Sequence, residues 1–331
     1  MKIFDAYIRY ICNVRRYSDR TVALYEHAVK DYLSHVFPEG VPEDDAEVAK
    51  AFNTSEIRSY MVHMLDSTPP MSAKTVSLHL SALSSICRYM MKEGLLRSNP
   101  VRLVTKPKVE KRVPQFYRKD SMDEYFNTTS HLLANDEYDA FLREWHTLSG
   151  KEYYSGLLER MVISTLYSLG LRRSELIGLK VGNVDFGRNV VKVCGKGDKM
   201  REIPLVPLLS EEILLYLKAV ETMCGRERSL EEPLFVTYSG NPLYAKYVDR
   251  VVKSALGRVR SVKGRKSPHV LRHSLATELM NGDAELNSIK ELLGHSSLAA
   301  TQVYTHSSIA RLKDSYERAH PRAKNGGKHG D

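Results

Sequence analysis

The sequence predicts a mainly α-helical protein of two domains, with a small antiparallel β-sheet in the second domain. Three observations support this prediction. The 331 residues exceed the usual size of one domain. Apolar residues recur at helical spacing from the N-terminus to Glu93. Short runs with strand character occur only from Val181 onward.

The sequence predicts only helices in the first part of the chain, up to Glu93. Start signals such as Ser18 and Asp19, and the stop signal Gly94, bound the periodic runs. The expected helices are Phe4–Ile11, Val22–Val36, Thr54–Leu65 and Ser72–Glu93.

A stretch with two prolines and four basic residues, from Lys106 to Pro114, follows the predicted helices. It has the composition of an extended interdomain linker rather than of a core element. We therefore expect a helical domain over 1–105, a basic linker over 106–119, a second domain over 120–323, and a disordered polar tail over 324–331.

The second domain mixes helices with strands. Three strand-like runs are expected, and a turn at residues 195–199 joins the last two. They are Val181–Phe186, Val190–Cys194 and Arg201–Leu205. Expected helices are Glu211–Met223, Tyr247–Arg260, His269–Met280, Leu286–Leu293, Leu298–Tyr304 and an amphipathic Ile309–Ala319. An acidic, aromatic stretch, Asn135–Trp145, could be an added helix or a partner contact.

Basic residues are concentrated late in the chain. The net charge is +9, and eight basic residues between 246 and 266 face a single acidic one, Asp249. They are Lys246, Arg250, Lys253, Arg258, Arg260, Lys263, Arg265 and Lys266; the linker adds Lys106 and Lys108. Such an excess suits binding of a polyanion such as DNA, but it also fits a solvated basic face.

No apolar run reaches the length of a membrane span, and the first twenty residues lack the pattern of a signal peptide. We therefore expect a cytoplasmic protein that does not associate with membranes.

Four local patterns carry chemically useful side chains. They are Gly170–Leu176, the Gly195–Lys199 turn, His269–His273, and Leu293–His295 followed nine residues later by Tyr304. Each is weak alone: Tyr304 is one of 19 tyrosines, and His273 alone is better explained as a packed helix residue.

In this order and spacing, the patterns resemble the tyrosine recombinases of the phage integrase superfamily, and most closely the bacterial Xer recombinases. The segments that carry the resemblance extend over nearly the whole chain. They are 17–21, 111–114, 170–172 with 174–176, 195–197, 269–273, 293–296, 301–306 and 319–323.

The resemblance implies a clamp-like fold, with a core-binding domain followed by a catalytic domain. It also implies six catalytic residues: Arg172 and Arg272 as the phosphate clamp, Lys196 on the hairpin, His269, His295, and Tyr304 as the nucleophile. Glu175 would support the first arginine.

The chemistry of metal-free strand transfer fits these residue types. Two guanidinium groups can donate paired, charge-assisted hydrogen bonds to a phosphate whose negative charge grows in the transition state. A tyrosine needs only modest activation because its pKa is about 10. The leaving 5′ oxygen needs a general acid, which Lys196 could supply, and His295 could act as a proton shuttle.

We therefore expect no metal and no other cofactor. The sequence shows no acidic cluster with magnesium-type spacing. Zinc held by His269, His273 and His295 is the rival interpretation, but no glutamate stands between the first two as in an HExxH motif.

By resemblance, the protein would be a site-specific recombinase that forms a 3′-phosphotyrosine bond on double-stranded DNA, independently of ATP. It would act as a homo- or hetero-tetramer on paired recombination sites, in chromosome or plasmid dimer resolution, with an accessory DNA translocase as a candidate partner. Alternatives are an integrase, invertase or transposase of a mobile element, and a non-enzymatic architectural DNA-binding protein.

Overall fold

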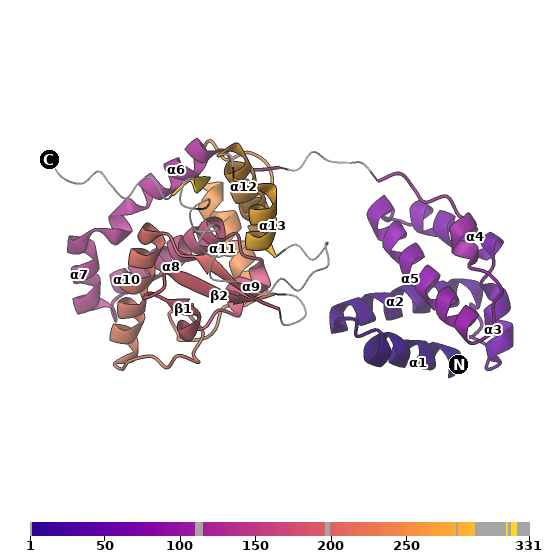
Figure 1. Ribbon diagram of the computed structural model, residues 1–331. Coiled ribbons are helices and arrows are strands. Elements are labelled where there is room, and N and C mark those ends of the chain that lie inside the picture. The colour runs from indigo at the N-terminus through magenta and orange to yellow at the C-terminus, as the bar shows by residue number, and fades with distance from the viewer. Residues whose placement is uncertain are drawn as a thin grey trace. The chain divides into compact units, whose positions relative to one another are not determined.

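The computed structural model describes residues 2–109, 115–195, 199–282, 284–294, 316 and 319–322. The chain divides into two compact units, residues 1–112 and 113–331 (Figure 1). The fold is mainly helical with one small antiparallel sheet, as predicted. The domain and linker boundaries proposed from the sequence remain a prediction.

The first unit is a helical bundle whose described elements confirm the four expected helices and add a short one. Their bounds are α1 Lys2–Arg9 with a following π-turn at Tyr10–Val14, α2 Asp19–Val36, α3 Asp45–Ala51, α4 Thr54–Asp66, α5 Ala73–Lys92 and a 3₁₀ turn at Pro100–Leu103. Polar side chains cap several helices. Ser18 caps α2, Asn53 caps α4 and Ser72 caps α5, each accepting a hydrogen bond from a backbone N–H of the first turn.

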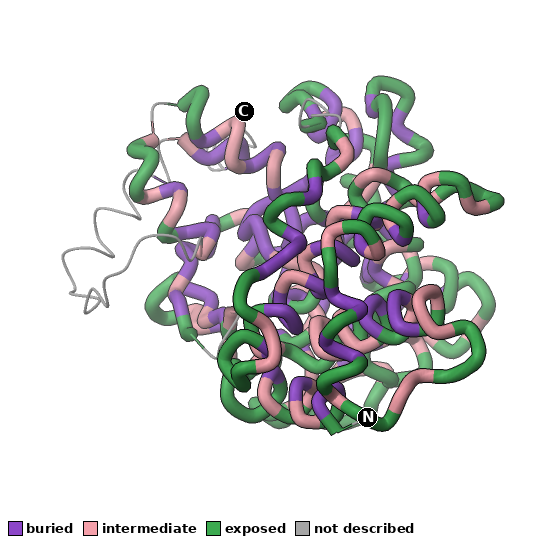
Figure 2. The backbone as a smooth tube through the Cα atoms, turned by 90° about the vertical axis from the view of Figure 1, so that its right-hand side faces the viewer, coloured by how far each residue is buried: buried purple, intermediate pink, exposed green. Residues whose placement is uncertain are grey.

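The second unit is built around helix α8, Leu148–Leu169, which contacts α7, α10, α11 and α12. The other described elements are α6 Lys119–Thr128, α7 Asn135–Glu144, α9 Arg173–Ile177, α10 Pro207–Cys224, α11 Ala245–Gly257, α12 Pro268–Asn281 and α13 Leu286–Leu293. From Leu157 to Leu169 all but one of the residues of α8 are buried (Figure 2 shows the burial along the chain). Sequence periodicity did not predict α8, because a helix covered on nearly every side has no polar stripe.

The sheet has the order β1-β2-β3 and is antiparallel throughout, with β1 at Val184–Asp185, β2 at Val190–Cys194 and β3 at Met200–Pro204. Val193 of β2 pairs with Arg201 of β3. The expected strand Val181–Phe186 was wrong in its first half. There the Asn183 side chain accepts a hydrogen bond from the backbone N–H of Lys180, and a 3₁₀ turn forms over Val181–Asn183.

The acidic, aromatic stretch forms helix α7, and its apolar face packs within its own chain. Tyr138 and Phe141 belong to the core of the second unit, and the Tyr138 hydroxyl donates to the carbonyl of Leu215 over 2.9 Å. Of the two interpretations of this stretch, an added helix or a partner contact, the structure supports the added helix.

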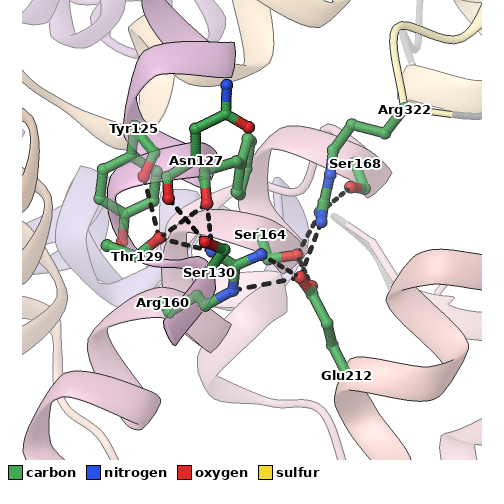
Figure 3. Close-up of polar contacts among 10 residues, drawn as sticks. Tyr125, Asn127, Thr129, Ser130, Arg160, Ser164, Ser168, Glu212 and Arg322 are labelled. Atoms are coloured by element: carbon green, nitrogen blue, oxygen red, sulfur yellow. Dashed lines mark hydrogen bonds and ion pairs between the residues drawn. The ribbon is translucent and has the colours of Figure 1, made fainter. Parts of the chain in front are cut away.

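The described residues near the C-terminus are anchored to the second unit (Figure 3). The Arg322 guanidinium donates to Ser168 Oγ at 3.0 Å and to Glu212 Oε1 at 2.8 Å. Arg160 Nη2 donates to the same Oε1 at 2.7 Å, so one buried carboxylate holds two buried arginines. We call this set, Arg160, Glu212 and Arg322, the C-terminal anchor.

The amphipathic helix expected over Ile309–Ala319 lies mostly outside the described residues, as does the expected helix Leu298–Tyr304 and the tail from 324. The two described members of the first helix, Tyr316 and Ala319, pack in the core of their own chain. Tyr316 donates from its hydroxyl to the carbonyl of Ser168 in α8, and Ala319 lies beside Gly282. The resemblance also suggests that the 309–319 segment docks on a neighbouring protomer, and that expectation stays a prediction.

No helix in the described parts of the chain is long and apolar enough to span a bilayer. Within the same residues, no three His, Cys, Asp or Glu side chains are grouped as metal ligands.

Candidate active site

Arg172 is positioned by the sharp turn that ends α8. Gly170 has a left-handed conformation, with φ of +58°, and Arg172 stands immediately before α9. Its backbone N–H donates to Glu175 Oε2 at 2.8 Å and its Nη1 donates to Glu175 Oε1 at 2.6 Å. Glu175 thus supports the first arginine, in line with the role that the resemblance implies for it.

Glu175 is also held by an arginine that sequence reasoning missed. Arg201 of β3 donates from Nη1 and Nη2 to the two carboxylate oxygens, at 3.0 and 2.8 Å. Burial alone would raise the pKa of Glu175, but the hydrogen bonds from Arg201 and Arg172 lower it to about 2. Glu175 is therefore a permanent anion that orients guanidinium groups, and it cannot donate a proton near neutral pH.

Arg272 lies on α12 and contacts the same turn and the same carboxylate. Its Nη1 donates to the carbonyl of Gly170 at 2.6 Å and lies 3.9 Å from Glu175 Oε2. Burial, followed by the charge of Arg172, lowers the pKa of Arg272 to about 10. The guanidinium therefore stays charged at neutral pH, as a phosphate clamp requires.

Three arginines meet the end of α13, each donating to a different carbonyl. Arg201 Nε donates to Leu292 at 2.9 Å, Arg272 Nη2 donates to Leu293, and Arg172 Nη2 donates to Gly294 at 2.9 Å. Cations stabilise a helix C-terminus because its last carbonyls have no partner within the helix. The residue after Gly294 is His295, so the cluster holds the backbone directly before a candidate catalytic histidine.

The side chains of Arg172 and Arg272 differ in exposure. The Arg172 side chain is 32% exposed, whereas that of Arg272 is 9% exposed. Among the described residues, the Arg172 guanidinium donates only to Glu175 and Gly294, which leaves further N–H groups for an anion. The cluster can thus present guanidinium N–H groups to an anion from Arg172 first.

The structure places the remaining candidates as follows. His269 is exposed in the first turn of α12, three residues before Arg272 and on the same side of the helix. His273 is half-buried. Lys196, His295 and Tyr304 lie outside the described residues, and so do the resemblance segments at 111–114 and 301–306.

The predicted basic positions are accessible. Of the eight between 246 and 266, seven are exposed and Lys266 is half-buried; Lys106 and Lys108 are exposed. Arg258 forms an ion pair with Glu159, and the Arg250 guanidinium lies 5.4 Å from the ring centre of Tyr247.

The Phage integrase family profile matches residues 131–311, and the Phage integrase N-terminal SAM-like domain profile matches residues 4–94. The first match alone covers more than half of the chain and contains every candidate catalytic position. The chain therefore belongs to the phage integrase family.

Similarity to known proteins shows which type of recombinase the chain is within the phage integrase family. The chain is 32% identical to tyrosine recombinase XerC of Chlorobaculum parvum over 96% of this chain and 94% of that one. It is 28% identical to XerC of Bacillus subtilis over 96% and 95%. It is a site-specific tyrosine recombinase of the Xer-like type, as the sequence motifs indicated.

Solved structures share the fold at low identity. The XerH recombinase bound to its difH substrate aligns with a TM-score of 0.59 and 18% identity, over 89% of this chain and 78% of that one. A lambda integrase dimer bound to a core site aligns with a TM-score of 0.58 and 17% identity, over 100% and 78%. These likenesses support the mainly helical fold assigned above.

Proposed function

We propose that this recombinase cuts and rejoins double-stranded DNA through a covalent bond between Tyr304 and a 3′ phosphate. The observation that carries the proposal is the convergence of Arg172 and Glu175, at the start of α9, with Arg272 of α12 onto one site. Two charged guanidinium groups at one point suit a phosphate that gains negative charge during in-line attack.

In the proposed reaction the Tyr304 oxygen attacks phosphorus and passes its proton to a histidine of the site, while the bond to the 5′ oxygen breaks. Lys196 donates a proton to that leaving oxygen, and His269 and His295 bind the phosphate or relay protons. A 5′ hydroxyl of a second strand then attacks the phosphotyrosine and gives its proton to Lys196, while the released tyrosine takes its proton back from the histidine. The phosphotyrosine keeps the energy of the broken phosphodiester bond, so the steps need no ATP. The two guanidinium groups stabilise the phosphate charge in place of a metal.

The proposed partners are paired DNA sites and further recombinase protomers. The lambda integrase and XerH structures with this fold hold DNA, and one lambda integrase structure is a tetramer on a Holliday junction. We propose the same kind of assembly here, as a homo- or hetero-tetramer, with the exposed basic positions of 246–266 and of Lys106 and Lys108 facing the DNA backbone. As part of the same proposal, the protein acts in the cytoplasm, resolves chromosome or plasmid dimers, and is controlled by an accessory DNA translocase.

Covalent capture tests the proposal. Cells producing the wild-type protein are lysed in detergent, DNA linked to the protein is recovered, and its sequence defines the site. A nicked duplex carrying that site then traps the cleaved intermediate. We expect an adduct with the wild type, no adduct with Tyr304→Phe, and wild-type trapping with the control Tyr244→Phe, whose ring is exposed on the surface.

The captured sequences also separate the alternatives. Capture at one chromosomal or plasmid locus supports dimer resolution, and capture at the ends of a mobile element supports an integrase, invertase or transposase. Equal DNA binding by wild type and Tyr304→Phe, with no adduct from either, would favour an architectural protein and contradict the proposal.

A further inference from the structure

Arg201 is a buried arginine on β3 whose donors all point at the candidate active site. Its side chain is 6% exposed. It makes a bidentate pair with Glu175 and donates from Nε to the carbonyl of Leu292. A Cβ added at Gly294 would lie 3.2 Å from Arg201 Nη1, so the end of α13 packs directly on this guanidinium.

The backbone of Arg201 belongs to the hairpin that carries Lys196. Arg201 pairs with Val193 across the two strands, and Gly195 N donates to the carbonyl of Lys199 at 2.8 Å at the base of the turn. Lys196 follows Gly195 directly. One side chain therefore joins three parts of the site: the hairpin, the carboxylate that holds Arg172, and the helix end that precedes His295.

We propose that Arg201 is a positioning residue for recombination. It fixes the hairpin against Glu175 and α13, and in this way sets where Lys196 stands relative to the scissile phosphate. The inference rests on the proposed function, in which Lys196 protonates the leaving 5′ oxygen. Arg201 itself is too buried to contact DNA.

The geometry requires an arginine rather than any cation. A lysine ammonium is a single point charge, whereas the planar guanidinium can bind both carboxylate oxygens and still donate from Nε. Arg201→Lys therefore keeps the charge beside Glu175 but cannot keep both contacts at once. A displacement of about 1 Å in a catalytic group can reduce the rate roughly 100-fold.

Leaving-group chemistry separates a positioning role from a purely structural one. Cleavage is measured on two duplexes carrying the captured site, one with the normal 5′ oxygen and one with a bridging 5′ sulfur at the scissile position. A thiolate leaves without protonation because thiols are far more acidic than alcohols, with a pKa of about 8.5 for cysteine against about 16 for water. A defect confined to Lys196 is therefore relieved on the sulfur substrate.

For Arg201→Lys we expect cleavage of the oxygen substrate to fall about 100-fold. We expect DNA affinity to stay within about threefold of wild type, which is less than the tenfold change that 1.4 kcal/mol of binding energy produces. On the sulfur substrate most of the loss should disappear, as it should for Lys196→Ala. The matched control is Arg188→Met, because Arg188 forms a bidentate pair with Glu202 of the same sheet at 2.9 and 2.9 Å but is 45% exposed. It should cleave both substrates like the wild type.

Trp145 fluorescence confirms that each variant is folded at the assay temperature, and Arg201→Gln replaces Arg201→Lys if the latter is unfolded. Equal losses on both substrates, or no loss on the oxygen substrate, would overturn the positioning role. Unfolding of both variants would also overturn it, since Arg201 would then act through stability alone. Failure of the wild type to form an adduct would instead remove the proposed function itself.

Discussion

The C-terminal anchor offers the sharpest test of the energetics of this fold. Glu212 is 1% exposed and accepts hydrogen bonds from Arg160, Arg322 and Ser164. Burial would raise its pKa, but the charges of Arg322 and Arg160 hold the pKa below its ordinary value. Glu212→Gln keeps the size of the side chain and removes the anion, leaving two buried guanidinium groups without a counter-charge.

The expected loss is large because the remaining charges stay out of water. Removing one partner of a buried ion pair typically destabilises a protein by about 3–5 kcal/mol, against a total stability of about 5–15 kcal/mol for a domain. The matched control is Glu231→Gln. Glu231 pairs with Lys180 at 2.6 Å but is 82% exposed, and exposed pairs contribute about 0–1 kcal/mol.

Urea denaturation followed by tryptophan fluorescence measures the difference. The protein has one tryptophan, and Trp145 packs against the core of the second unit, so its emission reports on that unit. With a urea slope of about 3 kcal/mol per molar, a loss of about 3–5 kcal/mol moves the midpoint down by roughly 1–1.7 M. A shift for Glu212→Gln no larger than that of Glu231→Gln would refute the reasoning.

Two further predictions concern backbone conformation and pH. Gly170→Ala should destabilise the second unit by about 2–4 kcal/mol, since φ is +58° and the new Cβ would lie 2.7 Å from Leu293 Cδ2. The control is Gly225→Ala, where φ is +65° but no atom lies within 4 Å of the new Cβ, so only the conformational part, about 1–2 kcal/mol, should be lost. Equal urea midpoints for the two variants would contradict the packing argument. Burial lowers the pKa of His320 to about 3, so His320 stays neutral in the folded state. The unfolded chain protonates this histidine below its ordinary pKa of about 6.5. The stability of the folded state is therefore complete above a pH of about 6.5 and falls by about 1.4 kcal/mol per pH unit as pH drops toward about 3. His320→Gln should remove that part of the slope in urea midpoints between pH 7 and pH 5, and an unchanged slope would disprove it.

The sequence predicted the helical first unit and the hairpin well because their signals are local. Alternating strand residues flank the Gly195–Lys199 turn, and capping residues such as Ser18 and Ser72 stand directly before periodic apolar runs. The pairing of Arg172 with Glu175 was expected from the family resemblance rather than from a local pattern.

Arg201 and the anchor could not be predicted in the same way. Charged residues are mostly exposed, so a single arginine in a strand or helix is first taken for a surface residue. Arg201 reaches Leu292 across 91 positions, and Arg322 reaches Glu212 across 110. Only the packing of distant segments determines which arginines are buried, and no local pattern marks that outcome.

The anchor also has a consequence for the order in which the protein matures on the ribosome. The first unit uses only residues up to 112, so it can fold while the rest is still being synthesised. The second unit must wait, because Tyr316, His320 and Arg322 fill its interior. Its core closes only after residues downstream of Tyr304 have emerged, so a nascent chain contains the proposed nucleophile before the framework of the second unit is complete.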